Sequence, residues 1–332
     1  MSTAVVMVEV QRGGLVESRH RGHAVVCDAS GAVVAAWGDP DAVILPRSSV
    51  KMIQALPLIE SGAADRAGLG VEQLALACAS HQGAPLHVGK VGDWLATLGL
   101  DESHLRCGAQ PTRDRDERQR MVRAEEAPCQ LHNNCSGKHA GFLTLTRDLG
   151  AGPEYNEIDH PVQVAVRAAF EDVTGAASPT FGIDGCSAPN FATTMQGLAR
   201  AMARFAVARP DTGDARGRAA GRLVQAMMAH PDLVAGQGRA CTELMQAAEG
   251  KAAIKTGAEG VFTAILPEQG LGVALKIEDG AARASEAAIA ALLVRLGVLQ
   301  ADDPAVRRRM AAPVTNWRGI TTGEVRAVPG LF

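Results

Sequence analysis

Apolar and polar positions follow a strand-like pattern near both ends of the chain and a helical period between them. Two β-prone runs, residues 24–27 and 32–37, flank the turn sequence DASG and predict a hairpin close to the N-terminus. Three more short β-prone runs cover residues 253–256, 260–266 and 272–277, with turn residues between them. The pattern therefore predicts strands at both ends of the chain.

The middle of the chain has apolar residues at helical spacing. Several segments start at a proline or a cap residue and stop near a glycine, as helix ends do. The predicted helices cover residues 71–80, 85–98, 137–149, 161–174, 189–209, 216–229 and 240–248, followed by 281–296 after the last strands. We predict an α/β fold with one mainly antiparallel sheet, built from residues 1–47 and 250–332, and a helical lobe of residues 48–249.

Composition narrows the function. Hydrophobic residues make up 47% of the 332 residues, enough for a large core, whereas aromatic residues are only 3%, which argues against base stacking on nucleic acid. A net charge of −3 gives no basic surface for nucleic acid or an anionic membrane. The N-terminal sequence lacks the features of a signal peptide, and no apolar run approaches the length of a membrane span. Seven scattered cysteines do not form a disulfide framework, so a cytoplasmic protein is expected.

The pair Ser48 and Lys51 lies where the first strands end and a helical period begins. Positions three apart share one helical face, so Lys51 can take the proton of Ser48 if burial or a second cation disfavours its charged form. The same S-x-x-K sequence also occurs wherever a serine caps a helix that carries a surface lysine. By itself the pair is a weak indication of a nucleophile.

A second motif strengthens this interpretation. Lys255-Thr256-Gly257 ends the first strand of the C-terminal group, and S-x-x-K followed much later by K-T-G is the pattern of penicillin-recognising serine hydrolases. Ser80, in the sequence ASHQG, is a candidate for relaying a proton, or equally a polar residue of a turn.

Two cysteines in glycine- and asparagine-rich turns indicate a small metal site. Cys135 lies in HNNCSGKH and Cys186 in GIDGCSAPN. From side-chain chemistry alone the expected zinc ligands are Cys135, Cys186 and His139, with His132 in reserve. The alternative is a pair of buried free thiols at tight turns.

Five segments together resemble the Rhizobium etli type of L-asparaginase. They are RSSVKM at 47–52, ASHQG at 79–83, HNNCSGKHAGF at 132–142, GIDGCSAPNFA at 182–192 and KTGAEGVF at 255–262. The resemblance spans nearly the whole chain. It implies a fold like that of serine β-lactamases and glutaminases, a homodimer, and hydrolysis of L-asparagine to L-aspartate and ammonia.

The resemblance also assigns roles to residues. It implies a catalytic group of Ser48, Lys51, Ser80 and Lys255, and a Zn²⁺ ion held by Cys135, Lys138 and Cys186. Lys138 thereby replaces His139, which is expected beside the metal and the substrate together with Asp184. Arg47, Asp184 and Glu259 are candidates for holding the substrate's ammonium and carboxylate groups, or ordinary ion-pair partners.

The expected reaction is acyl transfer. Ser48 attacks the amide carbon, Lys51 accepts its proton, Ser80 passes a proton to ammonia, and the positive charge of Lys255 keeps Lys51 neutral. Whether Ser48 or Ser80 carries the acyl group stays open, and Ser48 is favoured. The alternatives are a glutaminase, a β-lactamase-like hydrolase, or a non-catalytic zinc-binding protein.

Overall fold

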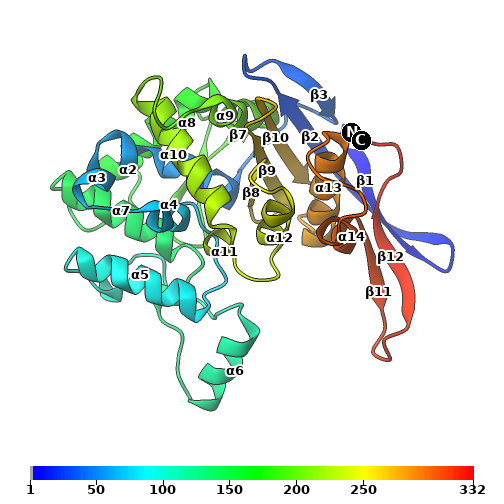
Figure 1. Cartoon of the computed structure of the whole chain (residues 1–332), viewed down its shortest axis with the longest axis horizontal. Coiled ribbons are helices and arrows are strands. Elements are labelled where there is room, and N and C mark those ends of the chain that lie inside the picture. Colours follow the sequence, from blue (N-terminus) through cyan, green and yellow to red (C-terminus); the bar gives the residue numbers. More distant parts are fainter. Residues whose placement is uncertain (1–2) are drawn as a thin grey trace. The chain divides into compact units, whose positions relative to one another are not determined.

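The computed structural model describes residues 3–332, which form two compact units (Figure 1). The first, called here the sheet unit, contains the chain up to Ser49, then Thr193–Val207 and Glu243–Phe332. The second, the helical unit, contains Val50–Ala192 and Ala208–Thr242.

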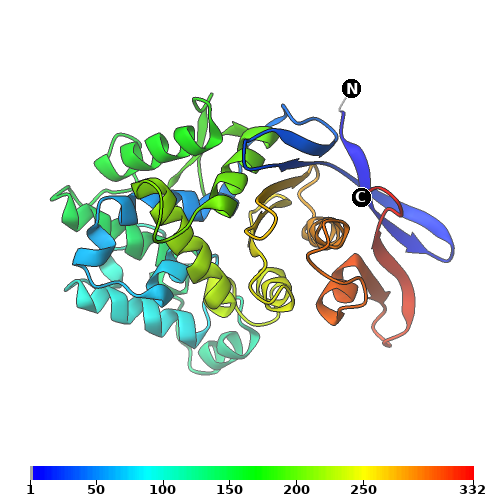
Figure 2. The same cartoon turned by 45° about the horizontal axis from the view of Figure 1, so that its top comes forward.

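One antiparallel sheet of eight strands forms the sheet unit, in the order β11-β12-β1-β2-β10-β9-β8 with β3 also paired to β2. Its strands are β1 (Val5–Arg12), β2 (Leu15–Cys27), β3 (Val33–Trp37), β8 (Ala253–Thr256), β9 (Val261–Leu266), β10 (Leu271–Ile277), β11 (Ala311–Thr315) and β12 (Thr321–Ala327). Figures 1 and 2 show N-terminal β1 beside C-terminal β12. The predicted α/β class, with an antiparallel sheet built from both chain ends, is confirmed.

Helices cover the middle strands of this sheet. Helix α9 (Met195–Val207) packs on β2, β9 and β10, and α13 (Ala282–Arg295) packs on β1, β9, β10 and β12. Every residue of β9 is buried, because its alternating side chains meet a covered surface on both faces. Helix α14 (Pro304–Met310) packs against β11 and β12.

The segment 189–209 corrects one sequence prediction. A single helix was expected, but the chain first forms β6 (Pro189–Phe191), paired with β5 (Phe181–Ile183), and then β7 (Thr193–Thr194), paired with β4 (Val43–Ile44). Helix α9 begins only at Met195. Its small and apolar face packs on the sheet, so the structure groups it with the sheet unit, although the sequence assigned it to the helical lobe.

The helical unit is built around α4 (Val71–Ala77), whose C-terminal half is buried, and α7 (Ser136–Asp148). All residues of α7 from Ser136 to Thr146 are buried. A Cβ atom added at Gly137 would lie 2.5 Å from the Leu76 carbonyl oxygen, so a glycine allows the N-terminus of α7 to lie against α4. The other helices of the unit are α1 (Lys51–Gln54), α2 (Leu56–Glu60), α3 (Ala63–Arg66), α5 (Pro85–Thr97), α6 (Arg115–Arg123), α8 (Pro161–Thr174), α10 (Ala215–Ala229) and α11 (Pro231–Val234), and α12 (Ala240–Ala247) spans the boundary.

Along the described residues, 3–332, none of the helices combines the length and the apolar character that crossing a bilayer requires.

Candidate functional site

Lys51 is a buried lysine at the start of α1 in the helical unit, with only 1% of its surface exposed. Its Nζ donates hydrogen bonds to the carbonyl oxygen of Ala79 and to that of Asn134, and lies 3.1 Å from the Sγ atom of Cys135. A buried ammonium needs such partners, and the three acceptors satisfy all of its N–H groups. A neutral Lys51 amine would donate its two N–H groups to two of these acceptors, and its lone pair could accept a proton.

The acceptors of Lys51 come from the two segments that the sequence singled out. Ala79 immediately precedes Ser80, which is buried and donates its backbone N–H to the carbonyl oxygen of Val234. His81 follows, and its backbone N–H bonds to the carbonyl oxygen of Asn134. The loop carrying Ser80 and the turn carrying Cys135 are therefore held together, with Lys51 against both.

The predicted metal ligands also meet in the helical unit. Lys138 Nζ lies 3.1 Å from Cys186 Sγ, and a hydrogen bond joins the Cys135 and Cys186 side chains. All three residues are buried. Lys51 therefore links the predicted catalytic residues to the predicted metal ligands through Cys135, a contact that the sequence analysis did not anticipate.

The two thiols differ in acidity because they interact with each other and with Lys138. The hydrogen bond between them, together with burial, raises the pKa of Cys135 to about 12. The same hydrogen bond holds the pKa of Cys186 well below its ordinary value, and the nearby Lys138 ammonium also lowers it. Burial alone would lower the pKa of Lys138, but the sulfur atoms of Cys186 and Cys135 outweigh burial and raise it. The favoured state is a Cys186 thiolate beside a charged Lys138.

A tight loop between β5 and β6 presents Cys186. The backbone N–H of Ser187 donates to the Asp184 carbonyl oxygen at 2.8 Å, and the Asp184 N–H donates to that of Ala188 at 2.9 Å. Ser187 has φ of 68°, an unfavourable conformation for a residue with a side chain. Backbone strain of this kind often occurs at functional sites. Asp184 itself is half-buried and contributes to the charge around Lys138.

In the sheet unit, Ser48 lies next to the end of β8. The hydroxyl of Thr263 donates to the Ser49 carbonyl oxygen at 3.1 Å, and a Cβ atom at Gly257 would lie 2.7 Å from the Pro46 carbonyl oxygen. The glycine of the K-T-G motif is therefore required for close approach to the segment that carries Ser48. Lys255 is 1% exposed, and its Nζ donates to the Thr256 carbonyl oxygen.

Arg47 and Glu259, the other predicted residues of the sheet unit, both have left-handed backbones, with φ of 56° and 57°. Lys276, which the sequence analysis missed, donates to the Glu259 carbonyl oxygen. Burial lowers the pKa of Lys276, opposed by the charge of Glu259 and assisted by that of Arg47. These side chains therefore share one electrostatic environment. Lys276 lies in β10, and only the pairing of β10 with the neighbouring strands β2 and β9 would have pointed to it.

The structure thus divides the predicted residues into two sets. The helical unit contains Lys51, Ser80, Cys135, Lys138, His139, Asp184 and Cys186, and the sheet unit contains Arg47, Ser48, Lys255 and Glu259. Convergence of Ser48, Lys51, Ser80 and Lys255 stays a prediction.

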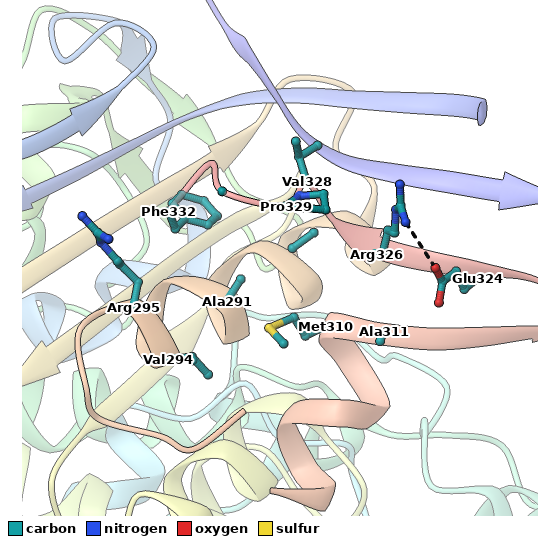
Figure 3. Close-up of a pocket in the computed structure, with 12 residues that line it drawn as sticks. Ala291, Val294, Arg295, Met310, Ala311, Glu324, Arg326, Val328, Pro329 and Phe332 are labelled. Carbon is teal, nitrogen blue, oxygen red and sulfur yellow. Dashed lines mark ion pairs between the residues drawn. The ribbon is translucent and has the colours of Figure 1, made fainter. Parts of the chain in front are cut away.

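A cavity of about 400 Å³ elsewhere in the sheet unit is not part of either set (Figure 3). It lies between α13, α14 and the C-terminal segment, and includes Ala291, Arg295 and Phe332. Figure 3 also shows the ion pair between Arg326 and Glu324, 3.7 Å apart. None of the predicted site residues lines this cavity.

The donor chemistry of the cysteine cluster fits a zinc ion. Two sulfur atoms and one amine gather in a buried place, and thiolates are ligands that zinc prefers. Over residues 3–332, no three His, Cys, Asp or Glu side chains are placed to share a metal. That Cys135, Cys186 and the neutral amine of Lys138 hold a zinc ion stays a prediction.

Comparison with known proteins identifies the family. The family model for L-asparaginase II matches residues 8–327. No curated protein sequence matches the chain. Among solved structures, Mglu in its native form aligns with a TM-score of 0.49 at 14% identity, covering 88% of this chain and 68% of Mglu. Mglu in its L-glutamate binding form gives 0.48 at 15% identity, covering 89% and 65%. A β-lactamase from Mycobacterium bovis gives 0.45 at 14% identity, covering 82% and 94%. The chain spans about two thirds of the length of Mglu.

Proposed function

Because the chain is an amidohydrolase of the L-asparaginase II family, we propose that it hydrolyses the side-chain amide of L-asparagine to L-aspartate and ammonia. The observation that carries the proposal is the environment of Lys51. It is buried, begins a helix three residues after Ser48, and has acceptors from the two segments that carry Ser80 and Cys135.

In the proposed reaction, Ser48 Oγ attacks the amide carbon while its proton moves to the neutral amine of Lys51. Ammonia leaves with a proton that Ser80 passes on, and the product of this step is an aspartyl ester of Ser48. Water then attacks the ester and releases L-aspartate. Lys255 contributes positive charge that favours the oxyanion.

The substrate is a free amino acid, so its ammonium and carboxylate groups both need partners. Glu259 and Asp184 have the charge to bind the ammonium, and Arg47 has the charge and geometry to bind the carboxylate. His139 is neutral at physiological pH, since burial and the adjacent Lys138 hold its pKa well below its ordinary value. It therefore contributes hydrogen bonds rather than charge.

A zinc ion bound by Cys135, Lys138 and Cys186 would supply a fixed positive charge beside the substrate. The remaining roles belong to the chain itself. The turn of Cys135 positions one acceptor of Lys51, and the loop of Cys186 places Asp184. The resemblance further implies a cytoplasmic location and a homodimer. Analytical ultracentrifugation would test the homodimer.

Ammonia release from L-asparagine and from L-glutamine, measured side by side, tests the substrate. We expect asparagine to be the better substrate and nitrocefin not to be hydrolysed. Ser48→Ala should reduce ammonia release at least about a thousandfold, as loss of a nucleophile does, with an unchanged melting temperature because Ser48 is only half-buried.

Two results would contradict this proposal. If L-glutamine is the far better substrate, the protein is a glutaminase rather than an asparaginase. If Ser48→Ala retains activity, Ser48 is not the nucleophile. Mass spectrometry of the trapped acyl-enzyme distinguishes Ser48 from Ser80. For the metal, elemental analysis of the wild type and Cys135→Ala should show zinc only in the former, and equal zinc in both would reject the site.

A further inference from the structure

Tyr155, the only tyrosine of the chain, lies fully buried between the backbone of Arg106 and the ring of His139. Its hydroxyl oxygen is 2.7 Å from the backbone nitrogen of Arg106 and 2.8 Å from Nδ1 of His139. A backbone N–H can only donate, so the tyrosine oxygen accepts from Arg106. The Tyr155 oxygen could also accept from a protonated Nδ1, but its own hydroxyl proton would then be buried without an acceptor, so donation from Tyr155 to Nδ1 of His139 is the arrangement that satisfies both groups.

This direction determines the tautomer of His139. Nδ1 accepts a proton from Tyr155 and is therefore unprotonated, so the proton of the neutral ring is on Nε2. The ring is held from two sides, because its centroid lies 5.4 Å from that of Tyr155 and 5.7 Å from that of Phe142. Both aromatic contacts are edge-on and restrict rotation of the imidazole.

The Nε2–H group of His139 has no hydrogen-bond partner in the described part of the protein. His139 is 0% exposed, so water at the protein surface does not supply the partner. A buried donor without an acceptor lowers stability, and natural proteins retain one mainly where a ligand or an ordered water completes it. His139 also follows Lys138 and lies in the same unit as Asp184, both assigned to the proposed site.

We propose that Tyr155 is a positioning residue that holds His139 as its Nε2–H tautomer, so that this N–H donates to a carboxylate or amide oxygen of the bound substrate. The inference rests on the proposed function for the identity of the substrate, but not for the tautomer. Tyr155 touches neither the substrate nor the reacting atoms. It acts through His139 alone.

Tyr155→Phe tests the role with little change in packing, since phenylalanine keeps the ring and loses only the hydroxyl. The proton of His139 is then free to occupy Nδ1, which leaves Nε2 an acceptor facing a substrate oxygen. We expect KM for L-asparagine to rise about tenfold, while kcat changes by less than about threefold. Loss of the acceptor for Arg106 N–H also lowers stability, so the melting temperature is not a test of the role.

A matched variant separates positioning from structure. In His139→Gln the side-chain amide places an N–H near the position of Nε2, and an amide has no tautomer for Tyr155 to select. Adding Tyr155→Phe to His139→Gln should therefore raise KM by less than about twofold. An equal tenfold rise in both backgrounds would show that Tyr155 acts only through the fold, and would overturn the proposal.

Nitrogen NMR of ¹⁵N-histidine protein reports the tautomer directly. The signals of His139, assigned by their loss in His139→Gln, should show a protonated Nε2 in the wild type and a mixture of tautomers in Tyr155→Phe. A protonated Nδ1 in the wild type would overturn the inference. If no amide substrate yields ammonia, the proposed function fails, and the nitrogen spectrum still decides the role of Tyr155.

Discussion

At the scale of single residues, Lys51 shows which features of the site the sequence predicts and which it does not. Its spacing from Ser48 predicts a shared helical face, but the structure places Ser48 in a 3₁₀ helix, Arg47–Val50, and begins α1 only at Lys51. Its contact with Cys135, 84 positions away, depends on how the turn before α7 lies against the start of α1, and nothing near Lys51 in the sequence encodes that contact. The Cys135 and Cys186 turns were recognisable from their composition, whereas their meeting point with Lys138 required the fold.

His87 gives a prediction about pH. Burial lowers its pKa below the ordinary 6.5, opposed by its hydrogen bond to the Asp232 carbonyl oxygen. The unfolded chain then binds a proton that the folded protein does not. The contribution of neutral His87 to the free energy of unfolding is therefore fully present above pH 6.5, and it is lost as the pH falls from 6.5 toward the folded-state pKa.

Replacing His87 by phenylalanine should reduce this pH dependence, since the aromatic ring keeps its stacking with His81 but cannot titrate. We expect the free energy of unfolding, measured in urea between pH 7 and pH 5, to fall with decreasing pH less steeply in His87→Phe than in the wild type. The two slopes should differ by up to about 1.4 kcal/mol per pH unit. Identical slopes in the two proteins would show that His87 takes up its proton while folded.

At the scale of elements, segments with a clear apolar pattern were predictable, and the two C-terminal strands were not. Helix α8 spans the residues expected from its proline start and glycine end, and β8 matches its predicted run. Strands β11 and β12 were missed, because AAPVT and TTGEVRA contain too few apolar residues for a strand pattern. Their pairing with each other and with β1 defines them, and a single sequence does not reveal such distant pairing.

The packing of α9 on β10 leads to a second prediction. A Cβ atom at Gly272 would lie 2.0 Å from the backbone nitrogen of Ala203 and 2.3 Å from the Ala199 carbonyl oxygen, so helix and strand would have to separate. Gly272→Ala should lower the free energy of unfolding by about 3 kcal/mol, at the upper end for overpacking.

The same substitution at Gly89 is the control. Gly89 lies inside α5, and an added Cβ atom would meet nothing within 4 Å. Gly89→Ala should therefore raise stability by about 1 kcal/mol through helix propensity. Chemical denaturation of both variants measures the difference, and an unchanged stability in Gly272→Ala would contradict the close approach of α9.

At the scale of the whole molecule, the seven cysteines differ sharply in access to solvent. All are free thiols, and in the part of the chain that the structure describes only Cys129 is half-buried rather than buried. Burial raises the pKa of Cys27 to about 11 and that of Cys107 to about 12, which leaves almost no reactive thiolate at neutral pH.

Brief treatment of the native protein with iodoacetamide should therefore label Cys129 before Cys27 and Cys107, which are modified only after unfolding. Peptide mass spectrometry at several times measures the order. Labelling of Cys27 at the rate of Cys129 in native protein would mean that the sheet unit opens readily.

The strand order of the sheet also has a consequence for synthesis. Strand β1 pairs with β12, and β2 pairs with β10, so β1 and β2 leave the ribosome well before these partners are made. At roughly 5–20 residues per second the delay is on the order of tens of seconds. During that time residues 24–27, which are fully buried in the finished sheet, lack β10 as their pairing partner. The sheet therefore completes its folding only after the helical unit has been synthesised.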